Sequence, residues 1–411
     1  MIQSAAAARL ILLLVAVTAV SQFYRASAAV IAPELMADLR IGPETLGLAG
    51  SAFFLALGVA QIPVGILFDR IGPRLTVGGL TLISVLGALL HAVAESGTIL
   101  VLSRAILGLG SAASFMSVVV FCARWFPRER LSLALSWVFS ASQVGILVAT
   151  TPLALATAAV GWRWTFVAAA LATAAIAIVF LWLVADDPPG RPPPPRPHES
   201  LGDVVRGLRD VWRMPGLPKV LAVHTFIYAS MATVLGLWAG PYLRDVHGLD
   251  AIARGNVLFA MAAAQVVGIL AFGPLDRIFN TRKWIVIAGG AGTVAVLTVL
   301  AIVPGMPLLP AIVLLVLLCG VTSYGLIVVA HGRSLFPDHL AGRGVTTVNI
   351  AQVTGSALLP ILTGVIIGAG SIDADVRPEI AYRLAFAAIA ACLAAGLAVY
   401  LTAEDAKPRQ S

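Results

Sequence analysis

A charged residue inside a long apolar run is the first clue to chemistry in this sequence. Thr18, Ser21, Gln22 and Arg25 lie in the run that follows Arg9, at spacings that put all four on one face of a helix. A guanidinium in apolar surroundings is costly, and its planar fork suits a carboxylate or phosphate. We expect this polar face to bind an anionic solute; the alternative is an arginine that extends to lipid headgroups.

A second polar group lies in the corresponding run of the other half of the chain. His224 and Tyr228 are four residues apart, with Thr225 beside them. The imidazole can bind solute, titrate during a reaction cycle, or simply pack between helices. Four glutamines at matched positions in the two halves can line one cavity or form hydrogen bonds between helices. The solute-binding candidates are Arg25, Gln22, Tyr24, Gln61, Gln143, His224, Tyr228, Gln265 and Gln352.

A charged turn, GILFDRIGPR, follows a long apolar run and ends at Arg74. Gly72 permits a tight turn, and Gly65 suits the close approach of two helices. The Asp69 carboxylate can pair with an arginine or accept hydrogen bonds from exposed N–H groups at a helix end. Alternatively the arginines only mark the side of the membrane that the loop occupies.

A less complete copy of this turn, GPLDRIFNTRK, contains Asp276 and Arg277. It has no glycine at the position of Gly72. Arg104 is the other arginine within a span, and Gly108 and Gly110 follow it. An arginine there must face protein or water, where it can serve coupling or hold backbone carbonyls; the structural role is slightly favoured.

The elements that position these residues follow from composition. Of the 411 residues, 59% are apolar and only 11% are charged, whereas soluble domains carry about 25% charged residues. Such a chain cannot cover a surface in water, so we expect an all-helical integral membrane protein. The net charge of +7 does not indicate nucleic-acid binding, because the basic residues lie in short clusters between apolar runs. The three cysteines fit neither a disulfide framework nor a metal site.

Twelve apolar runs are long enough to cross the ~30 Å hydrocarbon core as helices. The first resembles a signal peptide, but eleven further runs favour an uncleaved span. The predicted spans are 10–32, 46–67, 75–93, 98–122, 131–156, 163–184, 217–240, 254–275, 284–303, 308–331, 345–368 and 380–402.

Most lysines and arginines fall on one side if both termini are cytoplasmic, which fixes the expected orientation. The proline-rich stretch after the sixth span indicates an extended linker, and residues 201–213 show the pattern of an amphipathic surface helix. The expected organisation is a six-helix bundle (1–184), a cytoplasmic linker with that helix (185–216), a second bundle (217–402) and a cytoplasmic tail (403–411).

The two halves are similar in sequence at a nearly constant offset. An even number of spans per half keeps the halves in the same orientation, so this is a parallel repeat about an axis along the membrane normal. The matched pairs are Asp69-Arg70 with Asp276-Arg277, Phe126-Pro127 with Phe336-Pro337, and Gln143-Val144 with Gln352-Val353.

On these residues the sequence resembles the major facilitator superfamily. Residues 65–74 match its signature loop G-x-L-x-D-R-x-G-x-R, and Arg104, Gly108 and Gly110 match a second signature, R-x-x-x-G-x-G. The resemblance covers the whole chain and implies two six-helix bundles that expose a central site to each side in turn. It also implies that Asp69 and Arg70 form a conformational gate that holds the halves together while the site faces outward; this role is less well supported for the less complete copy.

Absences narrow the function. We find no Asp or Glu in the middle of any span, no Gly-Pro antiporter signature in span 5, and no nucleotide-binding loop. We therefore expect a secondary or facilitative transporter of a small anion or zwitterion, without a cofactor, metal or catalytic residue, and not an enzyme. We expect a monomer in the bacterial inner membrane whose partners are the solute and the lipid. The alternatives are a multidrug efflux transporter and a non-transporting sensor or assembly protein on the same scaffold.

Overall fold

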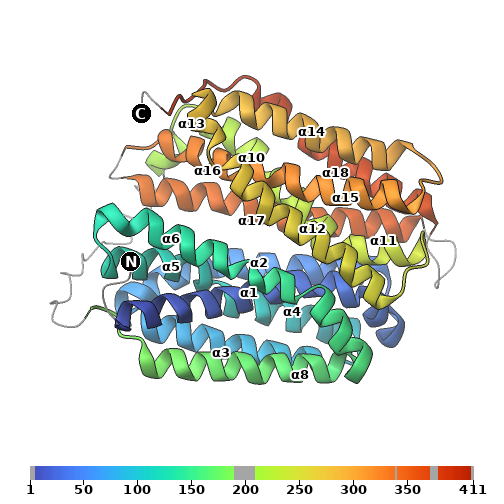
Figure 1. Cartoon of the computed structure of the whole chain (residues 1–411), viewed down its shortest axis with the longest axis horizontal. Coiled ribbons are helices and arrows are strands. Elements are labelled where there is room, and N and C mark those ends of the chain that lie inside the picture. Colours follow the sequence, from blue (N-terminus) through green and yellow to red (C-terminus); the bar gives the residue numbers. More distant parts are fainter. Residues whose placement is uncertain (1–4, 189–208, 338–339, 371–377, 409–411) are drawn as a thin grey trace. The chain divides into compact units, whose positions relative to one another are not determined.

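The computed structural model describes residues 5–188, 209–337, 340–370 and 378–408 (Figure 1). These residues form helices joined by short turns and contain no strand, as the composition predicts. Most of the linker and of the amphipathic segment expected at 201–213 lies outside the described residues. Contacts between Cα atoms divide the chain into two compact units, which are described separately. Unit 1 is residues 1–41 with 52–197, and unit 2 is residues 42–51 with 198–411.

The first half of the chain forms eight helical segments, from α1 in dark blue to α8 in green in Figure 1. Within unit 1, α3 lies along both α4 and α8, and α1 packs against α5, α6, α7 and α8. The segments are α1 (Ala5–Leu39), α2 (Pro43–Arg70), α3 (Pro73–Ala92), α4 (Gly97–Ser111), α5 (Ala113–Trp125), α6 (Arg128–Ser142), α7 (Val144–Val148) and α8 (Thr151–Leu183).

The second half repeats this plan with different interruptions. In unit 2, α10 packs on α17 and α18, and α14 packs on α18. The segments are α10 (Leu217–Thr233), the π-helical turn η1 (Val234–Trp238), α11 (Ala239–Asp245), α12 (Ala251–Phe272), α13 (Leu275–Phe279), α14 (Lys283–Ile302), α15 (Leu308–Val321), the 3₁₀ turn η2 (Thr322–Tyr324), α16 (Gly325–Ser334), α17 (Ala341–Ala369) and α18 (Glu379–Tyr400).

Eleven stretches of the described residues are helical, long and apolar enough to cross a membrane. One of them, Leu133–Leu183, has 51 residues and would be about 75 Å long, more than twice the hydrocarbon thickness. Gly161 breaks it, with φ 80° and ψ 158°, a backbone conformation that glycine adopts without strain. The stretch therefore contains the two predicted spans 131–156 and 163–184, and the predicted twelve-span helical fold is confirmed.

Glycines set how closely the helices of unit 1 approach. A Cβ on Gly108 of α4 would lie 2.0 Å from the carbonyl oxygen of Phe53 on α2, and one on Gly110 would lie 2.4 Å from the backbone nitrogen of Ser84 on α3. Small residues let helix backbones meet in this way, where lipid provides no hydrophobic driving force for association. The second signature sequence is therefore a packing motif of α4 in this structure.

Candidate functional site

The span containing Gln143 is interrupted at that residue. Helix α6 ends at Ser142 and α7 begins at Val144, and the Gln143 N–H bonds to the Ser140 carbonyl three residues back at 3.2 Å. A Cβ on Gly145 would lie 2.0 Å from the carbonyl oxygen of Ala19. The backbone of α7 thus touches α1 beside the predicted polar face. Gln143 keeps right-handed helical angles, with φ −62° and ψ −17°, so the helix tightens locally at this residue and its direction continues.

The amide side chains meet at this crossing of α1 and α7. Gln22 Nε2 donates a hydrogen bond to Gln143 Oε1 at 2.8 Å. One turn earlier on α1, Thr18 is only 6% exposed, and neither its hydroxyl nor Gln22 Oε1 has a hydrogen-bond partner among the described residues. We call Thr18, Gln22, Arg25 and Gln143 the α1–α7 polar face. Two predicted candidates are therefore joined directly, and polar atoms beside them are unsatisfied.

Arg25 lies one turn beyond Gln22 and is half-buried. Its guanidinium carbon is 5.6 Å from the centroid of the Phe54 ring on α2, a residue of unit 1. This distance is within the range of a cation–π contact. The charge thus packs against an aromatic ring of its own bundle.

Tyr24 does not share that face, which corrects its assignment as a solute-binding residue. It is fully buried in the interior of unit 1, where its hydroxyl is 2.9 Å from the Thr173 hydroxyl of α8. Its carbonyl oxygen accepts a hydrogen bond from Arg104 Nη1 at 2.6 Å. Thr18, Gln22 and Arg25 recur at helical spacings of three and four, and Tyr24 falls outside that pattern. The aromatic residue holds the bundle together.

Arg104 is buried, and its contacts support a structural role. It is 2% exposed, bonds the Tyr24 carbonyl and lies 4.9 Å from the centroid of the Phe53 ring. Its neighbour His91, which sequence analysis did not single out, is fully buried. His91 Nδ1 is 3.2 Å from the Ser103 hydroxyl, and the imidazole ring stacks on Phe166 at 4.1 Å. Together these groups join α1, α2, α3, α4 and α8.

Unit 2 contains a similar crossing with different side chains. A Cβ on Gly355 of α17 would lie 1.7 Å from the carbonyl oxygen of Thr225 on α10. His224 is 1% exposed and lies beside Gln352 of α17, and Tyr228 follows half-buried one turn later. Unlike the span of Gln143, α17 continues unbroken past Gln352. Both crossings therefore use one glycine against one carbonyl, with a glutamine nearby.

The remaining glutamine candidates are buried on other helices. Gln61 of α2 and Gln265 of α12 are each 7% exposed. The Gln265 carbonyl accepts a hydrogen bond from the Ser323 hydroxyl at 3.1 Å, and its side-chain oxygen has no partner among the described residues. The structure pairs Gln22 with Gln143 and places His224 beside Gln352. A single chamber lined by all four matched glutamines stays a prediction.

The charged turn between α2 and α3 is held from the end of α8. Gly72 has φ 91°, and a Cβ there would lie 2.6 Å from the Asp186 carboxylate. That carboxylate accepts a hydrogen bond from the Arg74 N–H at 2.7 Å, at the start of α3, and Arg74 Nε donates to the Leu181 carbonyl at 2.8 Å. The turn thus needs glycine twice, for its backbone conformation and for the approach of a carboxylate.

The predicted gate residues of this turn lie at the surface. Asp69 and Arg70 are exposed, and Asp69 has no ion pair with any described residue. A Cβ on Gly65 would meet nothing within 4 Å. Within unit 1 no described helix approaches Gly65, and its role in close helix packing stays a prediction. The gate role of Asp69 and Arg70 stays a prediction.

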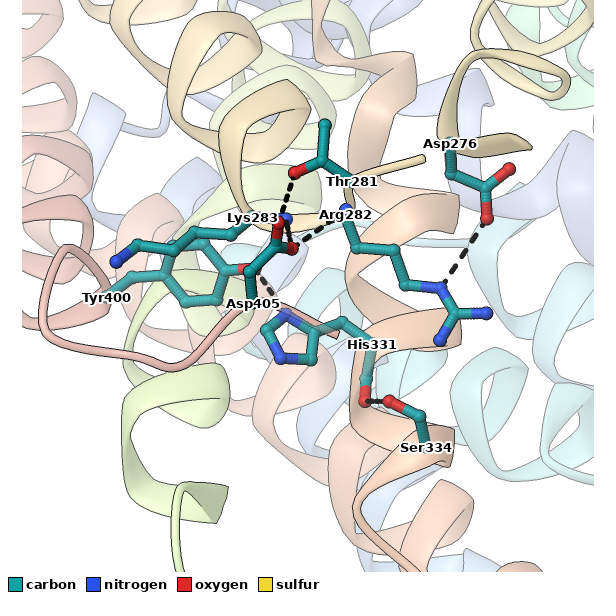
Figure 2. Close-up of polar contacts among 8 residues, drawn as sticks. All are labelled: Asp276, Thr281, Arg282, Lys283, His331, Ser334, Tyr400 and Asp405. Atoms are coloured by element: carbon teal, nitrogen blue, oxygen red, sulfur yellow. Dashed lines mark hydrogen bonds and ion pairs between the residues drawn. The ribbon is translucent and has the colours of Figure 1, made fainter. Parts of the chain in front are cut away.

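In unit 2 the matching turn is held by Asp405, from the segment after α18 (Figure 2). Its carboxylate accepts hydrogen bonds from the Thr281 hydroxyl at 2.6 Å and from the backbone N–H groups of Lys283 at 2.9 Å and Arg282 at 3.1 Å. Partial burial opposes the charged form, but these three hydrogen bonds outweigh it and hold the pKa of Asp405 below its usual value. Asp405 therefore caps α14 as Asp186 caps α3.

Two further contacts near this turn lie within unit 2 (Figure 2). Asp276 lies 3.5 Å from Arg282 Nε, and nearby the His331 Nδ1 is 2.5 Å from the Tyr400 hydroxyl. Asn280 ends α13 in the left-handed conformation, with φ 51° and ψ 40°. The partner of Asp276 is thus a residue of its own turn, while Arg277 is exposed. The copy therefore forms its turn with a left-handed Asn280 and the Asp405 cap, and not with a glycine at the position of Gly72.

Sequence reasoning missed both capping aspartates, although a signal was present. Each half places an Asp a few residues after its last apolar run, at Asp186 and at Asp405. Because carboxylates stabilise helix N-termini, such a residue can be matched to the start of another span in the same bundle. The structure also contains no cluster of metal-ligating side chains among the described residues.

Comparison with known proteins finds relatives that are named as transporters. The probable sulfoacetate transporter of Cupriavidus necator is 25% identical over 276 residues, 65% of this chain and 64% of that protein. The probable L-galactonate transporter of Escherichia coli is 31% identical over 37% of this chain and 34% of its own length. The chain thus spans less than two thirds of these two relatives. The gentisate transporter of Corynebacterium glutamicum is 24% identical over 81% of this chain and 75% of its own length.

Solved structures agree on the fold. A bacterial homologue of the human lysosomal transporter Spinster superposes with a TM-score of 0.81 at 16% identity, over 97% of each chain. A D-xylose–proton symporter gives a TM-score of 0.75 at 13% identity, over 96% of this chain and 98% of the other. The family model matches residues 14–332, well over half of the sequence. This multi-pass membrane protein therefore belongs to the Major Facilitator Superfamily.

Proposed function

We propose that the chain is a secondary or facilitative transporter that moves a small organic anion across the membrane by alternating access. The observation that carries the proposal is the α1–α7 polar face, where Arg25 lies two turns from Thr18 and one turn from the Gln22–Gln143 pair. An arginine within a membrane span marks a functional site by default. Three relatives are named as transporters of sulfoacetate, L-galactonate and gentisate, all of which are anions at neutral pH.

The energetics favour an anion over an apolar cargo. A buried guanidinium must recover the hydration that it loses, and a bidentate carboxylate or sulfonate supplies charge-assisted hydrogen bonds in the right plane. Phe54 lies 5.6 Å from the guanidinium carbon and is an aromatic neighbour of the same unit. A hydrophobic drug offers the guanidinium no acceptor, so multidrug efflux does not explain why an arginine is placed there.

The same proposal includes a location in the bacterial inner membrane. The distribution of lysine and arginine supports cytoplasmic positions for both termini. Asp69 and Arg70 act as a gate that holds the two bundles while the solute site faces outward. The chain acts as a monomer without a cofactor, and its cycle involves binding and release of solute rather than chemical conversion.

Binding of defined anions to the purified chain in nanodiscs tests this function. Sulfoacetate, gentisate and gluconate are added separately, and the melting temperature is followed, since a ligand stabilises the state that it binds. We expect at least one anion to raise the melting temperature and to exchange across proteoliposomes in counterflow. Arg25→Ala should abolish both effects, whereas Arg40→Asn, a change at an exposed arginine, should leave them intact.

Three results would contradict the proposal. If Arg25→Ala binds and exchanges the same anion with unchanged affinity, the polar face is not the anion site. If apolar cations stabilise the protein and no anion does, the efflux function is favoured instead. A chain that exchanges no solute under any condition would support a non-transporting role on this scaffold.

A further inference from the structure

The unsatisfied polar atoms beside Arg25 carry information about the solute, given the transport function proposed above. Thr18 is only 6% exposed, and its hydroxyl has no hydrogen-bond partner among the described residues. The side-chain oxygen of Gln22 is also buried without a partner. A buried polar group that forms no hydrogen bond costs about 1–3 kcal/mol. Two such groups in adjacent turns of one helix indicate a partner that arrives from outside the chain.

Most other buried helical threonines of this protein bond their hydroxyl within their own helix, and among the described residues Thr233 of α10 shares the exception with Thr18. A helical threonine normally bonds its hydroxyl to the carbonyl four residues earlier in its own helix. Thr76, Thr81 and Thr293 are buried on other helices, and each makes this bond at 2.8 Å. Thr18 lies in the uninterrupted helix α1 and makes no such bond with Leu14. Its hydroxyl is therefore not used by its own helix.

The chemistry of the two atoms specifies the partner. The Gln22 oxygen can only accept a hydrogen bond, so its partner must bring a donor, whereas the Thr18 hydroxyl can donate or accept. Because Gln22 Nε2 is already bonded to Gln143 at 2.8 Å, the amide oxygen is held in a fixed orientation. A simple carboxylate, nitrate or sulfonate has acceptors only and cannot satisfy Gln22. A hydroxyl group can donate to Gln22 and accept from Thr18.

The spacing of these residues along α1 also indicates the length of the solute. Thr18 and Arg25 are seven residues apart, about 10 Å along the helix axis, with Gln22 between them. A carboxylate at the Arg25 guanidinium therefore places the next groups of an extended solute beside Gln22 and then Thr18. We propose that this face selects a hydroxylated carboxylic acid, with the acid group at Arg25 and hydroxyl groups at Gln22 and Thr18.

The test compares two six-carbon acids that differ in their hydroxyl groups, D-gluconate and hexanoate. Dissociation constants are measured by calorimetry on the full chain in nanodiscs. A site built to hydrogen-bond a hydroxyl discriminates strongly against the analogue that lacks it. We expect gluconate to bind at least about tenfold more tightly than hexanoate. Thr18→Val and Gln22→Met should each bring this ratio down by about tenfold.

Matched controls separate selectivity from folding. Thr293→Val removes a buried hydroxyl that already bonds the Gly289 carbonyl, so it should leave the gluconate-to-hexanoate ratio unchanged. The melting temperature of each variant without ligand shows whether it is folded. A ratio that persists in folded Thr18→Val and Gln22→Met would overturn the inference.

The outcomes also distinguish this inference from the proposed function. If gluconate and hexanoate bind equally, and both are lost in Arg25→Ala, the anion site stands and the hydroxyl selectivity is overturned. If sulfoacetate binds through Arg25 and gluconate does not, the result is the same. If no anion of any kind binds, the proposed function fails and the inference fails with it.

Discussion

The crossing of α1 with α7 and the crossing of α10 with α17 use one backbone device and differ in their side chains. In each, a glycine meets a carbonyl oxygen so closely that a Cβ would lie at 2.0 Å or 1.7 Å. The first crossing has a locally tightened helix, an amide pair and an arginine one turn away. The second has a continuous helix and a fully buried histidine beside a glutamine.

This difference indicates that the two similar bundles have different roles. The shared glycine contact sets how closely the helices approach, and it constrains the sequence in both halves. The side chains around it are then free to differ, so a permanent cation occurs at one crossing and a neutral or titratable ring at the other. Recognition of an anion is expected to reside in the first crossing, and packing in the second.

The largest effect is expected from filling the two glycine contacts. Gly145→Ala and Gly355→Ala each force a backbone shift, because the nearest atom is a carbonyl oxygen and not a flexible side chain. Overpacking typically costs about 1–3 kcal/mol or more, so the melting temperature should fall by several degrees, and further for Gly355→Ala.

Gly65→Ala and Gly79→Ala are the controls for that experiment. Both lie in helices, and a Cβ on either meets nothing within 4 Å. Alanine favours helix over glycine by about 1 kcal/mol, so these variants should be neutral or slightly more stable. Equal melting temperatures for all four variants would show that the close crossings are not needed for stability.

The second largest effect is expected on anion affinity, which should depend on the first crossing and not on the second. Arg25→Ala should weaken sulfoacetate binding by about 10- to 100-fold, since hydrogen bonds to charged groups contribute about 1.5–3 kcal/mol. His224→Ala should change the same affinity by less than about threefold, because the anion contacts are placed at the first crossing. Calorimetric titration of both variants measures the contrast. Equal losses in both would mean that the two crossings recognise the anion jointly.

A smaller effect, on the melting temperature, is expected from replacing the carboxylates that hold the charged turns. Asp186→Asn and Asp405→Asn each weaken the cap of a helix, which costs about 1 kcal/mol, so each should lower the melting temperature by a few degrees at neutral pH. Differential scanning fluorimetry of the two variants beside wild type checks this. An unchanged melting temperature in both would show that the caps do not stabilise the bundles.

For Asp405 the pH dependence can be given a sign. Its pKa is lowered in the folded chain, by the hydrogen bonds from Thr281, Lys283 and Arg282 against the opposing effect of burial. The stabilisation is therefore fully present above the unfolded-state pKa of about 3.9 and is lost as the pH falls through the lower folded value. The difference between wild type and Asp405→Asn should stay constant from pH 7 to 5 and shrink below about pH 4. A difference that grows on acidification would contradict this assignment.

The sequence predicted the spans and the face of α1 because both depend on spacing within one segment. Apolar length located the helices, and helical periodicity grouped Thr18, Gln22 and Arg25. Tyr24 was assigned wrongly because it was taken from the neighbourhood of Arg25 and not from the face. Periodicity puts adjacent residues on different faces, and Tyr24 packs into the bundle.

Contacts between distant segments were harder to predict. The Asp186 and Asp405 caps each join residues more than a hundred positions apart, and no local pattern connects them. The tightened turn at Gln143 was also missed, because no proline stands at that position to indicate it. The left-handed Asn280 at the end of α13 was missed as well, although asparagine tolerates that region.

The smallest expected effect is the coupling between the two amides of the first crossing. Gln22 and Gln143 form a single interhelical hydrogen bond of 2.8 Å, and such bonds within membranes average about 0.6 kcal/mol in double-mutant cycles. A cycle with Gln22→Met, Gln143→Met and the double variant, followed by reversible unfolding in mixed micelles, should give a coupling of this size.

The matched cycle at the second crossing sharpens the comparison. The Thr225 hydroxyl already bonds the Leu221 carbonyl at 2.8 Å within its own helix, so Thr225→Val and Gln352→Met should combine additively. A coupling near zero there, beside a measurable one for Gln22 and Gln143, would place the specific polar contact at the tightened helix. Because additivity fails chiefly for residues that share a partner or a network, equal couplings would show that polar networks, and not only glycine contacts, are common to both crossings.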